Sequence, residues 1–262
     1  MVTSNLKQRL KNGEVCVGPF FKTLNQNMVE MMGFAGYDFI IVDNEHANFG
    51  HVDIENIIRA ADGVGLDSII RIPSGSEEHV LHSLDSGAIG IQVPSLRTVE
   101  EVKAMAPHTK YYPEGHRGIN TGQRAAKYGF MDGKEYFKLA NENTLVVVHV
   151  ENLDMAKQVD KLCAIPEVDV VFIGPADLSQ SMGMPMQTSA PEVVAVIDEI
   201  IEKIKASGKI VGIWVGNEKD AARYIEKGAR YLGYGSDTAL LVKVLKEAGG
   251  QVANIKKLAP GV

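Results

Sequence analysis

Residues 39–46 read Phe-Ile-Ile-Val-Asp-Asn-Glu-His, an apolar run that ends abruptly in polar residues. The four apolar residues predict a buried strand, because a strand covered on both faces reads as a continuous hydrophobic run. Asp43, Glu45 and His46 then follow the carboxyl end of that strand. In parallel α/β proteins, ligands bind at this end of the sheet. The stretch therefore predicts both a parallel fold and the edge that carries its site.

Two later stretches repeat this pattern of an apolar run followed by an acid. Residues 145–150 lead to Glu151, and residues 170–173 lead through Gly-Pro-Ala to Asp177. Since parallel strands bring their carboxyl ends to one edge, we expect all three acidic strand ends on the same rim.

The rest of the chain alternates between predicted strands and predicted helices. Strands are expected at residues 15–21, 38–43, 68–72, 89–93, 145–150, 168–173, 210–215 and 231–234. Helices are expected at residues 4–11, about 28–35, about 53–62, 77–85, from 98 onward, 134–141, 191–206, 218–226 and from 237 to about 247. This alternation, without a linker, predicts a single (β/α)8 TIM barrel domain over residues 1–262. An open Rossmann sheet is excluded, because Phe-Phe-Lys-Thr stands at residues 20–23 in place of G-x-G-x-x-G.

A loop-rich insertion at about residues 107–143 interrupts the alternation. Prolines and glycines punctuate a polar stretch there that is longer than most barrel connections. Long loops in compact domains are usually functional, so we expect this insertion to serve the function.

The composition excludes several classes of protein. The chain is 45% hydrophobic and 23% charged with a net charge of -6, which is typical of a globular protein and offers no basic face for DNA or RNA. No apolar run approaches the roughly 20 residues that cross a bilayer, and no signal peptide is evident, so we expect a cytoplasmic protein without membrane partners. Cys16 and Cys163 lie in apolar surroundings without the spacing of a zinc site, and both are expected in the core.

Glu151 and Asp177 are the candidate metal ligands. They follow strands about one βα unit apart, so a barrel would place both carboxylates on one rim. Two carboxylates, waters and a chelating substrate suit Mg²⁺ or Mn²⁺. The alternative is that each acid caps a helix or pairs with a lysine.

His46 and Arg71 are the candidate catalytic residues on the opposite strands. An imidazole beside carboxylates can act as a general base, although a hydrogen-bonded structural role is the alternative. Arg71 interrupts an apolar strand, where a charge is costly unless it is paired. It can neutralise a developing oxyanion, or it can simply pair with Asp43 or Glu45.

Taken together, these residues resemble the HpcH/HpaI family of class II pyruvate aldolases, of the 4-hydroxy-2-oxoheptanedioate and 2-dehydro-3-deoxyglucarate aldolase type. The resemblance extends in order over nearly the whole chain. Its motifs are Asp43-x-Glu45-His46, Arg71, Asp85-x-Gly87, Gln92-Val93-Pro94, Arg117-Gly118, Glu151, Gly174-Pro175-Ala176-Asp177-Leu178-Ser179 and Gly235-Ser236-Asp237.

The resemblance implies a barrel of the phosphoenolpyruvate/pyruvate-domain type and a divalent-metal-dependent aldolase using Mg²⁺, Mn²⁺ or Co²⁺. Such an enzyme reversibly cleaves a 4-hydroxy-2-oxo acid to pyruvate and an aldehyde through a metal-stabilised enolate. Glu151 and Asp177 would bind the metal, and the backbone amides of Ala176 and Asp177 would hold the carboxylate of pyruvate.

The resemblance also implies roles for the opposite strands. Arg71 would stabilise the enolate, and His46, oriented by Asp43 or Asp85, would act through water as the general base. A homohexamer is implied as well, with the last helix exchanged between neighbouring subunits.

Three positions depart from the family pattern, and the first is Phe20-Phe21, which replaces a tryptophan-containing end of the first strand. His149 stands where many members have glutamine, and it would contact substrate or metal, or only fill the barrel. Trp214 stands where a smaller aliphatic residue is usual, and its bulk favours a smaller or flatter aldehyde.

Two other functions compete with the aldolase. A carbon-carbon lyase acting on acyl-CoA thioesters would need a basic groove for the CoA phosphates, and few lysines stand near the strand ends. A barrel that binds an oxo acid without catalysis would not need a base such as His46.

Overall fold

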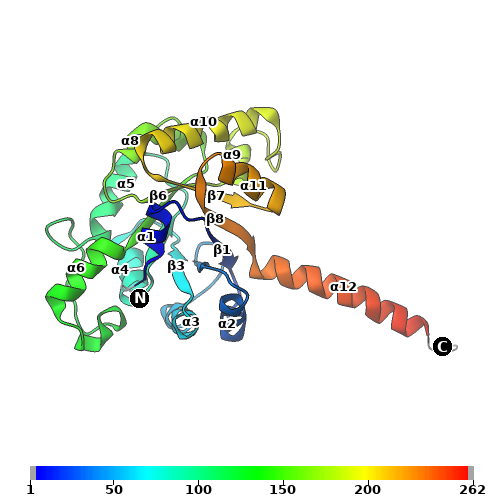
Figure 1. Cartoon of the computed structure of the whole chain (residues 1–262), viewed down its shortest axis with the longest axis horizontal. Coiled ribbons are helices and arrows are strands. Elements are labelled where there is room, and N and C mark those ends of the chain that lie inside the picture. The colour runs from blue at the N-terminus through cyan, green and yellow to red at the C-terminus, as the bar shows by residue number, and fades with distance from the viewer. Residues whose placement is uncertain (1–3, 259–262) are drawn as a thin grey trace.

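Eight parallel strands form a closed barrel in chain order in the computed structural model, which describes residues 4–258 (Figure 1). The strands are β1 (Cys16–Phe21), β2 (Phe39–Asp43), β3 (Asp67–Arg71), β4 (Gly90–Val93), β5 (Leu145–Val150), β6 (Val170–Ile173), β7 (Ile210–Val215) and β8 (Ala229–Ser236). The predicted (β/α)8 barrel is confirmed, and β5 and β7 have the predicted bounds.

Helices precede, connect and follow the strands. They are α1 (Leu6–Lys11), α2 (Gln26–Phe34), α3 (His51–Gly63), α4 (Glu77–Asp85), α5 (Val99–Met105), α6 (Gly133–Asn143), α7 (Leu153–Ala156), α8 (Val159–Cys163), α9 (Pro175–Ser181), α10 (Pro191–Ser207), α11 (Glu218–Glu226) and α12 (Asp237–Lys257), with the 3-10 helices η1 (Ala106–Thr109) and η2 (Arg124–Gly129). The helices α4 and α11 have the predicted bounds. The helices α7 and α8 were not predicted, because each is too short to display a helical period.

Apolar side chains fill the amino-terminal half of the barrel interior. Alternate residues of a strand face opposite sides of the sheet, so Phe39 and Ile41 of β2 point inward and join Phe172 of β6 in one cluster. Leu6 and Leu10 of α1 belong to the same cluster and are buried. Helix α1 therefore closes the amino end of the barrel.

A polar layer lies above this apolar plug. In the parallel register, Asp43 of β2 is the partner of Arg71 of β3, and Arg71 is the partner of Gln92 of β4. All three side chains are buried. The interior thus changes from apolar to charged at the carboxyl ends of the strands, which is where the acids were expected.

The insertion lies at the amino end of the barrel, on the side away from the polar layer. It joins the end of α5 to the start of β5, and Arg117 forms an ion pair with Asp85 at the end of α4, with 2.6 Å between Nη2 and Oδ1. Tyr111 and Tyr136 belong to a small buried apolar cluster within the insertion, separate from the barrel core. The insertion therefore lies away from the ligand face of its own barrel, because an αβ connection reaches the opposite end, and its expected functional role stays a prediction.

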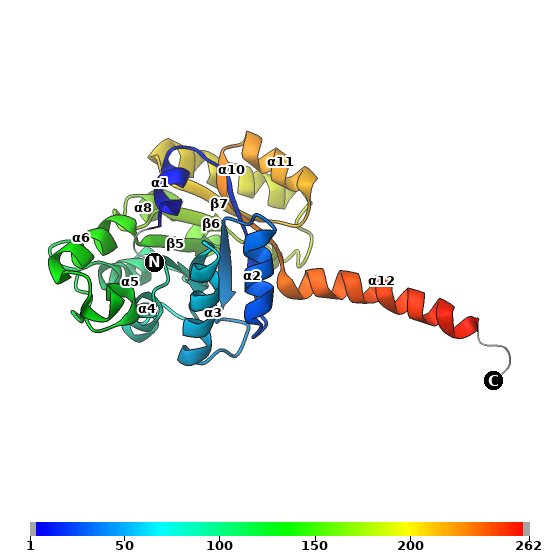
Figure 2. The ribbon, with the colours of Figure 1, turned by 60° about the horizontal axis from the view of Figure 1, so that its bottom comes forward.

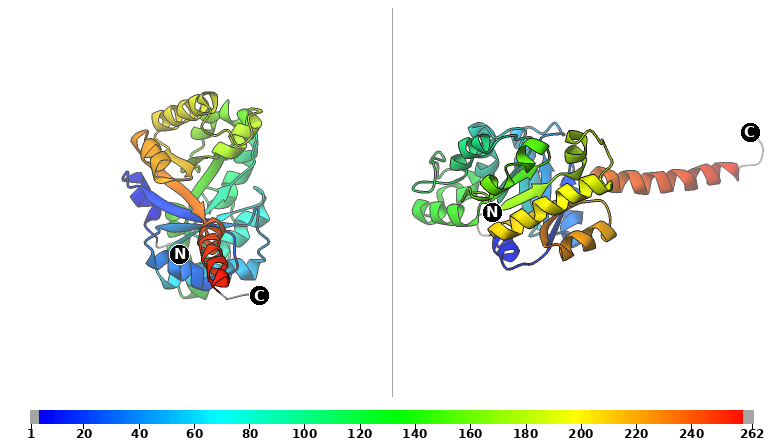
Figure 3. Two further views of the ribbon diagram at one scale, coloured as in Figure 1. Left: turned by 90° about the vertical axis from the view of Figure 1, so that its right-hand side faces the viewer. Right: turned by 90° about the horizontal axis from the view of Figure 1, so that it is seen from above.

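Helix α12 leaves the barrel and extends away from it (Figures 2 and 3). It continues to Lys257 instead of ending near residue 247, because Gly249 and Gly250 remain helical within it. Along its length only Asp237 is buried. Several large apolar side chains of α12 are exposed, namely Leu240, Val242, Val244, Leu245, Val252 and Ile255.

Asp237, the first residue of α12, connects this helix to the loop after β1. Its carboxylate accepts hydrogen bonds from the backbone N–H groups of Lys22 and Thr23, at 3.0 and 2.9 Å, and from the Thr23 hydroxyl at 2.6 Å. The side chain is fully buried. Hydrogen bonds therefore join the residues that follow β8 to the residues that follow β1 at the carboxyl face of the barrel.

Cys16 and Cys163 are free and buried, as predicted. Within residues 4–258, none of the helices combines the length and the apolar character that a membrane span requires.

Candidate active site

A cavity of about 520 Å³ opens at the carboxyl ends of the strands. It is lined by most of the predicted site residues, namely His46, Arg71, His149, Glu151, Ala176, Asp177 and Trp214. Asp43 lies directly behind Arg71 and is fully buried. The strand-end acids, the arginine and the histidine are therefore brought together as the alternation of strands and helices predicted.

Glu151 is a buried carboxylate on the cavity wall. Its Oε1 accepts a hydrogen bond from the backbone N–H of Ser95 at 2.5 Å, and its Oε2 lies 2.6 Å from Nδ1 of His149. Burial alone would raise the pKa of Glu151, but the adjacent imidazole and the Ser95 N–H lower it to about 2. Glu151 is therefore anionic at neutral pH.

The approach of Glu151 to β6 requires the glycine at position 174. A Cβ at Gly174 would lie 3.0 Å from Cβ and 3.1 Å from Oε2 of Glu151. The Gly-Pro-Ala-Asp turn thus brings the backbone before Asp177 against the carboxylate of Glu151.

His149 is the centre of a buried chain of hydrogen bonds. The Tyr231 hydroxyl donates to Oε1 of Gln92 at 2.8 Å, and Nε2 of Gln92 lies 2.7 Å from Nε2 of His149. Because the amide nitrogen can only donate, Nε2 of His149 accepts and its proton is on Nδ1, directed at Glu151. Both ring nitrogens are thus bonded to protein groups, which leaves His149 to orient Glu151.

Asp177 offers the second carboxylate and is exposed to the cavity. Among the residues that the structure describes, none forms a hydrogen bond or an ion pair with this side chain. The first backbone bond of α9 runs from Leu178 N–H to the Gly174 carbonyl at 3.0 Å, so the N–H groups of Ala176 and Asp177 precede the bonded turns.

Arg71 and Asp43 form the charged pair of the opposite wall. Nε and Nη2 of Arg71 donate to the two oxygens of Asp43 at 2.9 and 2.6 Å, and Nη1 lies 3.1 Å from Glu45. The guanidinium also lies over the Phe20 ring, at 4.6 Å from its centre. Burial would raise the pKa of Asp43, but the hydrogen bonds and the charge of Arg71 hold it below its ordinary value.

His46 is fixed by its backbone and not by its ring. Asp43 Oδ1 accepts hydrogen bonds from the backbone N–H groups of Glu45 and His46, at 3.2 and 3.1 Å. The imidazole itself is 59% exposed, and its nearest carboxylate is Glu45, with 3.6 Å between Nε2 and Oε2. Asp43 therefore orients His46 through its backbone N–H, while the Asp43 side chain is otherwise bonded to Arg71.

Asp85 is not part of the cavity within one chain. It ends α4, which returns to the amino end of the barrel, and its carboxylate pairs with Arg117. The structure therefore contradicts the prediction that Asp85 orients His46 in the same subunit.

Three contributors to the site were missed. Lys22 Nζ lies 3.2 Å from Oδ2 of Asp43 and lines the cavity. Ser95 has a positive φ of 62°, which directs its N–H at Glu151. Gln92 was visible in the sequence as a polar residue inside an apolar strand, the same signal that marked Arg71.

Comparison with known proteins supplies the remaining observation. Residues 17–244 match the family described as HpcH/HpaI aldolase/citrate lyase. The chain belongs to this family. The matched segment contains every cavity residue described above and all the strands except Cys16, the first residue of β1.

Two similar proteins of the HpcH/HpaI family are named as aldolases. The chain is 32% identical to a hydroxypyruvate/pyruvate aldolase of Pseudomonas aeruginosa, over 95% of this chain and 92% of that protein. It is 31% identical to a 2-keto-3-deoxy-L-rhamnonate aldolase of Shigella sonnei, over 94% and 92% of the two chains.

A solved structure confirms the architecture. The crystal structure of an HpcH/HpaI aldolase/citrate lyase family protein from Burkholderia cenocepacia superposes with a TM-score of 0.89 at 29% identity, covering 96% of this chain and all of the other (100%). The barrel of this chain therefore has the same architecture as that HpcH/HpaI family protein.

The donor groups of the family site in this chain suit a hard divalent cation. Glu151 is anionic and is held in place by two donors, and the Asp177 carboxylate, in the same cavity, has no bonded partner among residues 4–258. Hard cations such as Mg²⁺ and Mn²⁺ prefer oxygen ligands of this kind.

Proposed function

We propose that this protein is a divalent-metal-dependent aldolase, working as a single catalytic domain, that reversibly cleaves a 4-hydroxy-2-oxo acid to pyruvate and an aldehyde. The observation that carries the proposal is the pairing of buried, anionic Glu151 with unpaired Asp177 in one cavity, opposite Arg71. The similarity to the two aldolases of the same family supports it.

Glu151 and Asp177 would hold the metal, which we expect to be Mg²⁺, Mn²⁺ or Co²⁺. When bound, the cation supplies positive charge that stabilises negative charge developing on the oxo acid. The N–H groups of Ala176 and Asp177, at the start of α9, would hold the carboxylate of the substrate.

Arg71 would complete the electrostatic stabilisation from the other wall. A guanidinium has five N–H donors, and the contacts with Asp43 and Glu45 use three of them. The other donors are free to bind an oxygen of the substrate. Because Asp43 fixes the group from behind, Arg71 is held in place before substrate arrives.

His46 would move the proton. Its ring lies on the cavity wall and is half exposed, which suits a base acting through a water molecule. Glu45 is the carboxylate placed to hold the ring, and it is itself paired with Arg71. Trp214 at the mouth would restrict the aldehyde.

Pyruvate release from a generic 4-hydroxy-2-oxo acid, coupled to lactate dehydrogenase, tests the proposal. Metal-stripped protein should be inactive, and Mg²⁺, Mn²⁺ or Co²⁺ should restore activity. Glu151→Gln should remain inactive with every metal. Glu142→Gln, on the surface at the end of α6, is the matched control and should behave as the parent.

Lack of turnover with every metal, in protein of unchanged circular dichroism, would refute the aldolase. Condensation of an acyl-CoA with an oxo acid by the same preparation would then indicate the CoA-type lyase. Binding of pyruvate without either reaction would indicate the non-catalytic barrel.

We also propose a cytoplasmic homo-oligomer, a hexamer by the family resemblance, with α12 packed on a neighbouring subunit. Within residues 4–258 of a single chain, the large apolar residues of α12 remain exposed. Light scattering should give a mass several times 28.4 kDa, and Leu245→Glu should lower it, whereas Lys246→Glu should not.

A further inference from the structure

A second group of ligating side chains lies outside the active-site cavity, between the first turn of α3 and one face of α4. His51 is the first residue of α3, and Glu78 and His82 are on α4. Residues four apart lie on the same face of a helix, so Glu78 and His82 face α3 together. One ligand atom from each of the three side chains lies within 4.8 Å of the others.

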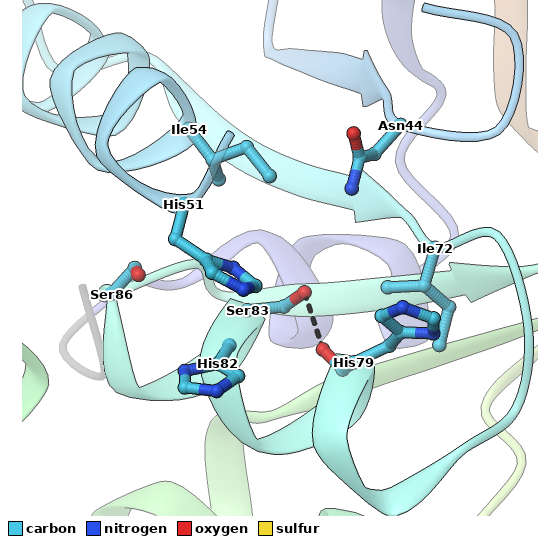
Figure 4. A pocket seen from close by; sticks show the side chains of 8 residues that line it. All are labelled: Asn44, His51, Ile54, Ile72, His79, His82, Ser83 and Ser86. Carbon is cyan, nitrogen blue, oxygen red and sulfur yellow. Dashed lines mark hydrogen bonds between the residues drawn. The ribbon is translucent and has the colours of Figure 1, made fainter. Parts of the chain in front are cut away.

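The two imidazoles face each other. Figure 4 shows His51 projecting from α3 toward α4, and the ring centres of His51 and His82 are 4.3 Å apart with 33° between their planes. Two aromatic nitrogen bases from separate helices are thus held side by side without any bond between them.

No other protein group uses these three side chains. Across residues 4–258, neither His51, Glu78 nor His82 forms a side-chain hydrogen bond or an ion pair. His79, one turn away, differs, because its Nδ1 lies 2.9 Å from the Ser76 hydroxyl and 3.0 Å from that of Ser74. The three ligand atoms are therefore available, whereas the neighbouring histidine is engaged.

The space beside the imidazoles admits one small occupant. His51 and His82 line a cavity of about 10 Å³ together with His79 but not Glu78, and a space of this size holds one water molecule or one ion but no organic ligand. Both helix starts carry partial positive charge, which opposes a cation. Asp53, Glu77 and Glu78, in the same first turns, supply compensating negative charge.

We propose that His51, Glu78 and His82 form a second metal site, distinct from the Glu151 and Asp177 pair, that binds Zn²⁺. Two imidazole nitrogens and one carboxylate are a characteristic ligand set for Zn²⁺ and leave further positions to water. The active-site pair offers only oxygen ligands, which favour Mg²⁺ or Mn²⁺. The two sites therefore select different ions.

A cation in the second site would connect the first turn of α3 to α4. It would also hold the start of α3 and thus the end of the loop from Asn44 to Gly50, which contains Glu45 and His46. The second site would therefore restrain the loop that contains the proposed base, without contacting substrate.

Titration calorimetry of Zn²⁺ into metal-free Glu151→Gln protein tests this inference, because that background removes the active-site carboxylate. One Zn²⁺ per chain should bind, and Mg²⁺ should not compete. His51→Gln and His82→Gln, added to this background, should each weaken the binding by about tenfold or more. His79→Gln, the matched control on the same helix, should leave it unchanged.

Thermal unfolding gives the second readout. Zn²⁺ should raise the Tm of the background protein and of the His79→Gln control, but not that of the His82→Gln variant, because a ligand stabilises only the state that binds it. Equal Zn²⁺ affinity in the His79→Gln and His82→Gln variants would overturn the proposal, as would the lack of Zn²⁺ binding. Neither result bears on pyruvate release, which is measured with Glu151 intact.

Discussion

Nδ1 of His149 lies 2.6 Å from Oε2 of Glu151, and the opposite nitrogen of the same ring lies 2.7 Å from the Gln92 amide. A histidine that lines the cavity therefore acts on the carboxylate next to it and has no nitrogen left for substrate. Groups that orient a metal ligand in this way contribute to metal affinity almost as strongly as the ligands themselves.

His149→Ala should therefore weaken Mn²⁺ binding by about 10- to 100-fold, because Glu151 loses one of its two donors. His149→Gln keeps an amide donor and should recover most of the affinity. The measurement is Mn²⁺ titration followed by pyruvate release at saturating metal. Equal metal affinity in all three proteins would show that the ring only fills the barrel.

The free energy of unfolding should depend on pH through the titration of Glu151. Its pKa is about 2 in the folded protein against an ordinary value of 4.5, so folding favours the anion. That contribution is complete above about pH 4.5 and is lost as the pH falls toward 2. Urea unfolding of metal-free protein should show a smaller decline in stability between these pH values for Glu151→Gln than for the parent. Equal declines in the parent and in Glu151→Gln would contradict the lowered pKa of Glu151.

The buried pair of Arg71 and Asp43 should be far more sensitive than a surface pair. Asp43→Ala leaves the guanidinium without its main partner and should cost about 3 kcal/mol of unfolding free energy. Asp154→Ala breaks the exposed contact with Arg97, where the two side chains are 57% and 69% exposed, and should cost less than about 1 kcal/mol. Denaturant unfolding of the two variants compares these costs directly, and similar values would refute the contrast.

Trp214 should limit the length of the aldehyde. Its ring lines the cavity and is 38% exposed at the mouth. Trp214→Leu should raise kcat/KM for a long aldehyde relative to a short one by about tenfold. Room for one additional methylene group in an apolar pocket changes kcat/KM by roughly this factor or more. The assay is the condensation of pyruvate with aldehydes of increasing length. An unchanged preference between short and long aldehydes would show that another residue limits the length of the aldehyde.

The parts of the site that could be predicted are those with a local signal. Asp43 and Glu151 each follow an apolar run directly, and Arg71 interrupts one, so both position and chemistry are visible in the sequence. The barrel then brings these residues to one rim by topology alone.

The missed parts depend on contacts between distant residues. Gln92 and Tyr231 are 139 positions apart, and the hydrogen bond between them has no local pattern. The Ser95 contribution is a backbone N–H, which every residue except proline has, so only the positive φ distinguishes it. Asp85 was assigned to the wrong end of the barrel because a motif gives order along the chain but not the side of the fold.

The contact of Asp237 with Lys22 and Thr23 determines where the chain can be shortened. The residue that begins α12 is also the anchor of the loop beside the cavity, so a deletion starting at Ser236 or Asp237 would release Lys22 together with the helix. A truncated protein meant to isolate the contribution of α12 should therefore keep Asp237 and Thr238. Loss of activity in such a protein would then be attributable to the missing helix and not to a loosened loop.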